Sequence, residues 1–134
     1  MSEFPKSETG CVADTILAME RAAMERWGQG DPNGFLEICD PDVAYFDPFQ
    51  ERRLDGIEAL TKLYDGLRGQ VRIDRFEFVN PKVQVVGDVA VLTFNFESWT
   101  KFVQYNWNTT EVYRRTDQGW RIIHTHWSIP QKGQ

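Results

Sequence analysis

The chain has 134 residues, of which 41% are apolar and 13% aromatic, and its net charge is −5. This length fits one domain with one core, and the apolar content excludes a disordered chain. The negative charge argues against a nucleic-acid partner, because basic residues occur only in short pairs such as Arg52-Arg53 and Arg114-Arg115. No apolar run has the length of a signal peptide or a membrane span, so we expect a cytoplasmic protein without membrane contact.

Helical periodicity governs the first half of the chain. Gly28 and Gly30 end a first predicted helix at Trp27, and Asp31 followed by Pro32 is typical of the start of a second, short helix that runs to Cys39. A brief strand is predicted from Val43 to Asp47, and Gly56 leads into a third helix that ends near Leu67. The apolar stripe of the first helix has steps of three and four residues and consists of Val12, Ile16, Met19, Ala23 and Trp27.

The remainder of the chain is rich in β-branched and aromatic residues and is predicted to be strand. The expected strands are 71–80, 82–86, 89–99, 103–115 and 120–129, separated by Asn80-Pro81, Gly87-Asp88 and polar turns. Helices followed by strands predict an α+β fold of order ααβαβββββ. In this fold a strongly bent antiparallel sheet packs on three N-terminal helices as a cone with an open mouth. The single domain is expected to span residues 12–130, with flexible tails at 1–11 and 131–134.

The last predicted strand carries large apolar groups on both faces. Strict alternation places Thr125 and Trp127 on one face, and the opposite face holds Trp120, Ile122, His124 and His126. We therefore expect one face to line a cavity and the other, together with Tyr113, to contact a second subunit.

Metal and cofactor sites have little support in the sequence. His124 and His126 point the same way and offer two nitrogens to a metal, with Glu111 as a conceivable third ligand, but a structural role for the histidines is the preferred interpretation. Cys11 and Cys39 lack metal-ligand spacing and are expected to be reduced thiols. No glycine-rich phosphate loop or nucleophile elbow is present, so we expect neither a cofactor nor a metal.

Three segments, in this order, resemble the nuclear-transport-factor-2-like superfamily: CDPDVAYFDP (39–48), VNPKVQVVGD (79–88) and TDQGWRIIHTHWS (116–128). The superfamily includes SnoaL-like polyketide cyclases, ketosteroid isomerase and the association domain of calcium/calmodulin-dependent kinase II. The nearest resemblance is to the association domain and its stand-alone bacterial relatives, over Val12 to Pro130. It implies a cone fold, a dimer or larger ring formed through the outer face of the sheet, and an interior pocket whose use varies among members.

Asp47 is the candidate catalytic residue. It shares a strand face with Tyr45, and a carboxylate desolvated in an aromatic pocket suits proton abstraction next to a carbonyl. Counting from Gly30-Asp31, the resemblance to ketosteroid isomerase places the catalytic Asp-Pro of that enzyme on Asp47-Pro48. The alternative is a structural role, because Asp before Pro often starts a turn and bonds to neighbouring amides.

The resemblance also predicts where the pocket departs from known members. The same count places Ala23 and Thr110 at the oxyanion-hole positions of ketosteroid isomerase, and Ala23 cannot donate a hydrogen bond, which disfavours steroid isomerisation. Trp127 stands where the association domain usually has Arg, which implies a more aromatic and less basic pocket. The expected ligand-binding residues are Trp27, Tyr45, Tyr64, Trp107, Thr110 and Trp127.

Two functions remain open from the sequence. The first is a homodimer that binds a small hydrophobic or aromatic molecule, as a binding protein or as a cofactor-free isomerase, cyclase or dehydratase with Asp47 as general base. The second is a non-catalytic oligomerisation module whose pocket is incidental or regulatory. A dimer that also binds a ligand satisfies both, so only turnover separates an enzyme from a binding module.

Overall fold

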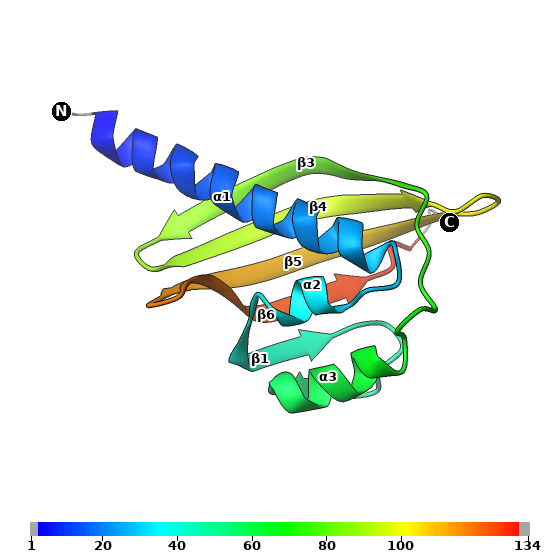
Figure 1. Cartoon of the computed structure of the whole chain (residues 1–134). Helices are drawn as coiled ribbons and strands as arrows, with labels where there is room; N and C mark the ends of the chain where they lie inside the picture. The colour runs from blue at the N-terminus through cyan, green and yellow to red at the C-terminus, as the bar shows by residue number, and fades with distance from the viewer. Residues whose placement is uncertain (1–2, 132–134) are drawn as a thin grey trace.

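The computed structural model describes residues 3–131, with side chains from residue 10 onward (Figure 1). The predicted tails at 1–11 and 131–134 fall partly on residues outside this description. Three helices are present in the described chain: α1 (Glu3–Trp27), α2 (Asn33–Leu36) and α3 (Ile57–Asp65). Within this part of the chain, no helix is both long and apolar enough to cross a membrane.

The helix boundaries follow from local chemistry. The buried side of α1 includes Val12, Ile16 and Ala23 of the predicted stripe. Asp31 sits just before α2, and its Oδ1 accepts the backbone N–H of Asn33 at 3.0 Å, which satisfies a free donor at the start of that helix. Gly56 precedes α3 with φ of 91°, a left-handed conformation that only glycine adopts without strain.

Six strands form one sheet in the order β2-β1-β6-β5-β4-β3. Their bounds are Cys39–Phe46 for β1, Leu54–Asp55 for β2, Arg75–Val86 for β3, Val89–Trp99 for β4, Gln104–Thr116 for β5 and Gly119–Ser128 for β6. All neighbouring pairs are antiparallel except β1 and β6, which are parallel, so the sheet is mixed. The predicted α+β class, with helices packed on a bent sheet, is confirmed.

Two details of the strand order differ from the prediction. The short strand β2, which pairs with β1, was not expected. The two strands predicted on either side of Asn80-Pro81 form a single strand, β3, whose pairing register with β4 shifts between Val79 and Lys82. Asn80 has φ of 51° at this bulge, and Pro81 is tolerated because β3 is an edge strand. Turn-forming residues here bend a strand without ending it.

A second bulge, in β6, decides which residues face inward. Val112 pairs with His124 but its neighbour Tyr113 pairs with Ile122, so Ile123 is left without a partner. Strict alternation is therefore broken, and Ile122 lies on the same side of the sheet as Thr125. The prediction that Tyr113, Trp120 and Ile122 face outward is wrong: their exposed fractions are 0%, 7% and 1%.

The helices lie on the inner face of the sheet (Figure 1). Helix α1 packs across β3 and β5: Arg21 lies over the Phe78 ring at 4.9 Å, and the Tyr113 hydroxyl bonds to Glu20. Phe94 stacks beside Phe78 with ring centroids 4.6 Å apart, and Phe96 is within 5.8 Å of Phe78. These rings fill the core between α1 and strands β3 and β4.

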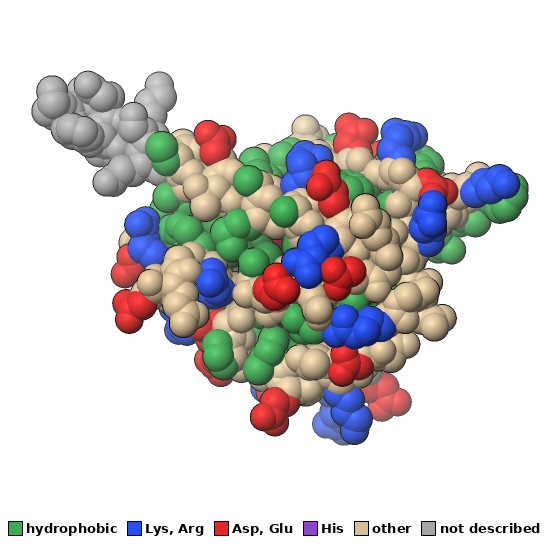
Figure 2. All heavy atoms as spheres, in the orientation of Figure 1, with side chains coloured by type: hydrophobic (Ala, Val, Ile, Leu, Met, Phe, Trp, Pro, Cys, Tyr) green, Lys and Arg blue, Asp and Glu red, His purple; other side chains and the backbone are tan. Residues whose placement is uncertain are grey.

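Figure 2 shows acidic and basic side chains interspersed over the visible face of the molecule. No extended area of a single charge is seen on this face. Cys11 is exposed and Cys39 is buried, and both are free thiols.

Candidate functional site

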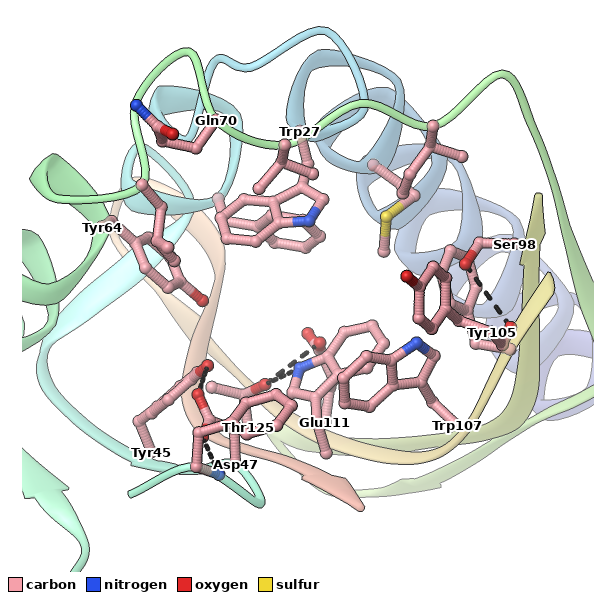
Figure 3. Close-up of a pocket in the computed structure, with 18 of the residues that line it drawn as sticks. Trp27, Tyr45, Asp47, Tyr64, Gln70, Ser98, Tyr105, Trp107, Glu111 and Thr125 are labelled. Atoms are coloured by element: carbon pink, nitrogen blue, oxygen red, sulfur yellow. Dashed lines mark hydrogen bonds between the residues drawn. The ribbon is translucent and has the colours of Figure 1, made fainter. Parts of the chain in front are cut away.

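A cavity of about 500 Å³ lies between the inner face of the sheet, the C-terminal end of α1 and helix α3 (Figure 3). Its volume falls within the range of about 300–1,000 Å³ that is typical of small-molecule sites. Residues of β1, β4, β5 and β6 form one side, and residues 67 and 70–73 lie on the loop that follows α3. Nine lining residues are aromatic: Trp27, Phe35, Tyr45, Phe49, Tyr64, Phe96, Tyr105, Trp107 and Trp127.

The aromatic residues form two groups on opposite sides of the cavity. On the helical side, the Trp27 and Tyr64 ring centroids are 4.9 Å apart, and Tyr64 meets Tyr45 edge to face at 5.8 Å. On the sheet side, Trp107 and Trp127 meet edge to face at 6.2 Å. Figure 3 shows Trp27 and Tyr64 across open space from Trp107. A molecule in this space would be bordered by ring surfaces on two sides.

Asp47 lies on the cavity wall at the end of β1. Its Oδ2 accepts the Tyr45 hydroxyl at 2.6 Å, and its Oδ1 accepts the backbone N–H of Phe49 at 2.7 Å. The carboxyl group therefore stabilises the turn after β1 and also lines the cavity. Burial, together with the hydrogen bond to Asp47, raises the pKa of Tyr45 well above its usual range, so this phenol remains a donor.

A pair of buried carboxyl groups lies at the floor of the cavity. Glu20 of α1 is 0% exposed, and Glu111 of β5, which lines the cavity, is 1% exposed. Burial raises the pKa of Glu20 to about 7, and burial together with the neighbouring Glu20 carboxyl raises the pKa of Glu111 well above its usual range. Each of these carboxyl groups therefore keeps its proton to a higher pH than an exposed glutamate does.

Hydrogen bonds extend from this pair in both directions. Tyr113 donates to Glu20 Oε1 at 2.7 Å, and Thr125 donates to Glu111 Oε2 at 3.1 Å. Trp127 in turn donates its indole Nε1–H to Thr125 Oγ1 at 2.9 Å. The other two oxygens, Glu20 Oε2 and Glu111 Oε1, have no partner among the described side chains. The network links the core under α1 to the cavity wall.

Most of the residues expected at the site surround this cavity. Asp47 and five of the six expected ligand-binding residues line it: Trp27, Tyr45, Tyr64, Trp107 and Trp127. Thr110 does not line the cavity. It pairs with Thr93 and His126 on the outer face of the sheet, and the next residue, Glu111, points inward instead.

Glu20 and Glu111 were not identified as site residues, although the sequence carries a signal for both. Glu20 occupies the apolar stripe of α1, one helical turn from Ile16 and one from Met24. Glu111 alternates with Thr109 and Tyr113 along β5 and so shares their buried face. A carboxyl group at a core position of two different elements indicates a buried polar pair.

The outer face of the sheet holds the two histidines. Phe46 of β1 lies beside them, with ring centroids 6.2 Å from His124 and 5.0 Å from His126. Partial burial and the charge of His126 lower the pKa of His124. Glu111 is on the opposite face, and among residues 10–131 no group of three His, Cys, Asp or Glu side chains is placed to hold a metal ion.

Comparison with known proteins identifies relatives of two kinds. A family model described as the SnoaL-like domain matches residues 16–132. A crystal structure of a putative ketosteroid isomerase from Parabacteroides distasonis is 40% identical, with a TM-score of 0.81, and the match covers 90% of this chain and 89% of that one. The association domain of C. elegans CaMKII shares the fold at 17% identity and a TM-score of 0.76, covering 90% and 98% of the two chains.

The second kind of relative also appears among curated sequences. The calcium/calmodulin-dependent protein kinase type II alpha chain of Drosophila melanogaster is 24% identical over 125 residues, which are 87% of this chain. The chain spans only 24% of the length of that kinase. The resemblance expected from the sequence, with isomerase-like and association-domain relatives sharing one fold, is confirmed. The family model covers most of the chain, which therefore belongs to the SnoaL-like domain family.

Proposed function

We propose that this chain binds a small, largely apolar molecule in its interior cavity. The observation that carries the proposal is the composition of the cavity wall, where aromatic rings predominate and a few polar groups converge from different elements. Asp47 with Tyr45 and Glu111 with Thr125 supply these polar groups. Such groups orient a ligand, while the ring surfaces contribute most of the buried area.

A thermal-shift screen against aromatic polyketides, steroids, small amines and small carboxylic acids tests this proposal, because a ligand that binds only the folded state raises Tm. We expect one compound class to raise Tm in wild type and to do so less in Asp47→Asn. Asp42→Asn is the matched control, since Asp42 is exposed on the same strand and does not line the cavity. Failure of every class to shift wild-type Tm would contradict ligand binding.

The second candidate function is proton transfer, with Asp47 as the general base. It is supported by the position of Asp47 on the cavity wall and by the buried Glu111 on the same wall, whose raised pKa favours the protonated form that can donate to developing negative charge. The 40% identical Parabacteroides protein bears the name of an isomerase. Ala23 has no donor to complete an isomerase-type oxyanion hole, so we do not extend the proposal to steroids.

Hydrogen–deuterium exchange separates an enzyme from a binding protein. A bound carbonyl compound should exchange its α-hydrogen in D₂O in the presence of wild type, as followed by NMR, and Asp47→Asn should slow this exchange by at least about 100-fold. Equal exchange rates with the two proteins would exclude Asp47 as the base.

Self-association through the outer sheet face is the remaining part of the proposed function. The structural similarity to an association domain supports it, as does the partly apolar outer surface that includes Phe46, Val91 and Val112. Association and ligand binding use opposite faces of the sheet, and one chain can therefore do both.

A further inference from the structure

The acidic and basic groups of the cavity lining are unequally placed. Asp47 and Glu111 are the acidic residues of the lining, and Arg72 is the single Lys or Arg among the described residues that line it. The side chain of Arg72 is 80% exposed and its Nε contacts Asp74 Oδ1 at 3.1 Å, so its charge lies outside the cavity and is already paired. No cation is thus available inside the lining to balance an anionic ligand.

The aromatic rings add to this preference for positive charge. Ring faces carry partial negative charge, and desolvated cations are attracted to Trp most strongly and to Tyr and Phe less. Three of the five tryptophans, Trp27, Trp107 and Trp127, line this one cavity. They stand on both sides of it, with Tyr45 and Tyr64 beside Trp27 (Figure 3).

A carboxyl group inside the aromatic enclosure completes the arrangement. Glu111 is 1% exposed, and its Oε1 accepts no hydrogen bond from any described donor. Asp47 accepts bonds from Tyr45 and Phe49 on the same wall, close to Thr125 and Glu111 (Figure 3). The Asp47 carboxylate, the unpaired acceptor Glu111 Oε1 and several ring faces thus border the same space.

We infer that the ligand of this cavity is an organic cation, an amine or quaternary ammonium group joined to an apolar or aromatic body. The inference rests on the proposed binding of a small molecule in the cavity and does not require turnover. The ammonium group lies among the ring faces within reach of Asp47 or Glu111, and the apolar body fills the remaining volume. The overall net charge of −5 adds a weak long-range attraction for cations.

The chemistry also explains why other ligand charges fit less well. A carboxylate or phosphate ligand would be desolvated beside Asp47 and the Glu20–Glu111 pair with no interior cation to offset the repulsion. A neutral ligand gains the apolar contacts but not the cation–π attraction, so it should bind more weakly than a cation of the same shape.

Three probes of nearly equal size test the inference by calorimetric titration at neutral pH: 2-phenylethylamine, 2-phenylethanol and phenylacetate. We expect the amine to bind at least about tenfold more tightly than the alcohol, and the acid to bind most weakly. A fourth probe, (2-phenylethyl)trimethylammonium, cannot donate a hydrogen bond from nitrogen. Its binding should match or exceed that of the amine if ring faces hold the charge.

Variants locate the selectivity within the cavity. Asp47→Asn and Trp27→Leu should each reduce the amine-to-alcohol affinity ratio by at least about threefold, while circular dichroism verifies that they are folded. Asp42→Asn and Trp99→Leu are matched controls outside the lining and should keep the wild-type ratio. An unchanged ratio in both cavity variants would overturn the inference.

The outcomes distinguish this inference from the proposed function. If the alcohol or the acid binds as tightly as the amine, the ligand is not a cation, although ligand binding stands. If no phenylethyl probe binds while an uncharged compound from the wider screen does, the inference fails and the proposed function survives. If no compound binds at all, both fail together.

Discussion

The two faces of the β5–β6 hairpin differ in burial and in chemistry. The inner face presents Glu111, Tyr113 and Thr125, which are buried and joined in a hydrogen-bond network with Glu20. The outer face presents Val112 and His124, which stay partly exposed in the single chain. One unpaired residue at the bulge in β6 decides which side chains belong to each face. The inner face therefore determines the fold and the cavity, while the outer face is available to bind another surface.

Substitutions at the adjacent residues Ile122 and Ile123 should show the largest difference between the two faces, measured as the change in the free energy of unfolding. Ile122 is 1% exposed on the inner face, and Ile122→Ala should lower the free energy of unfolding by about 2–5 kcal/mol. Ile123→Ala, which removes the same atoms at the bulge, should cost less than about 1 kcal/mol. Urea denaturation at low protein concentration measures both. Equal losses would mean that the bulge is misplaced and that strict alternation holds.

The same bulge shows what the sequence reveals about this fold and what it does not. The stripe of α1, the glycine before α3 and the β-rich second half were enough to predict helices followed by a sheet. The bulge at Ile123 has no glycine or proline to announce it, so alternation alone placed Ile122 and Trp120 on the wrong face. Asn80-Pro81 predicted a break between two strands. Pairing with β4 on both sides of these residues instead keeps them within one strand. Local signals mark where a strand is irregular, and tertiary pairing decides whether it ends.

A charge at the centre of the outer face should prevent the proposed self-association without unfolding the chain. Val112 lies between Val91 of β4 and His124 of β6, so Val112→Glu would place an unpaired carboxylate in the proposed contact. We expect self-association to weaken by at least about 100-fold, measured by sedimentation, with an unchanged circular dichroism spectrum. Val103→Glu, at an exposed position outside the strands, is the control and should keep the wild-type assembly. Association of the Val112 variant at wild-type strength would exclude this face as the contact.

The buried carboxyl pair should make the inner face more stable at low pH. The pKa of Glu20 is raised from 4.5 to about 7 by burial, so its contribution to stability is fully present below about pH 4.5 and is lost as pH rises through about 7. The double variant Glu20→Gln, Glu111→Gln keeps the shape of the pair and removes this loss, on the order of 3 kcal/mol. Tm measured across this range should fall less steeply with pH in the variant.

A second pair of glutamates provides the control for that experiment. Glu77 and Glu97 are cross-strand partners on the outer face of β3 and β4, where water reaches them. Glu77→Gln with Glu97→Gln removes the same two charges, and the pH profile of Tm should stay close to that of wild type. If both double variants flatten the profile equally, burial of Glu20 and Glu111 is not the cause.

The site was less predictable than the fold, for a reason visible in these carboxyl groups. Asp47 and the aromatic residues stand out in a sequence because their types suggest a pocket. Glu111 lies in a run of threonine, valine and tyrosine, where a glutamate is usually exposed, and its burial depends on Glu20, which is distant in sequence. The prediction that Thr110 lines the cavity was wrong by one residue. A residue count from a relative does not show on which face of β5 each side chain lies.

His124 should give the smallest effect, with a sign opposite to that of the inner pair. Its pKa is lowered from 6.5 by partial burial and by His126, so its contribution to stability is present above about pH 6.5 and is lost as pH falls below it. His124→Gln should therefore reduce the fall in Tm as pH drops below about 6.5, whereas the glutamate double variant changes the slope of the profile in the opposite direction. The effect should grow with protein concentration, because association would bury His124 further. If Tm declines equally at low pH in wild type and in His124→Gln, protonation of this histidine does not affect stability.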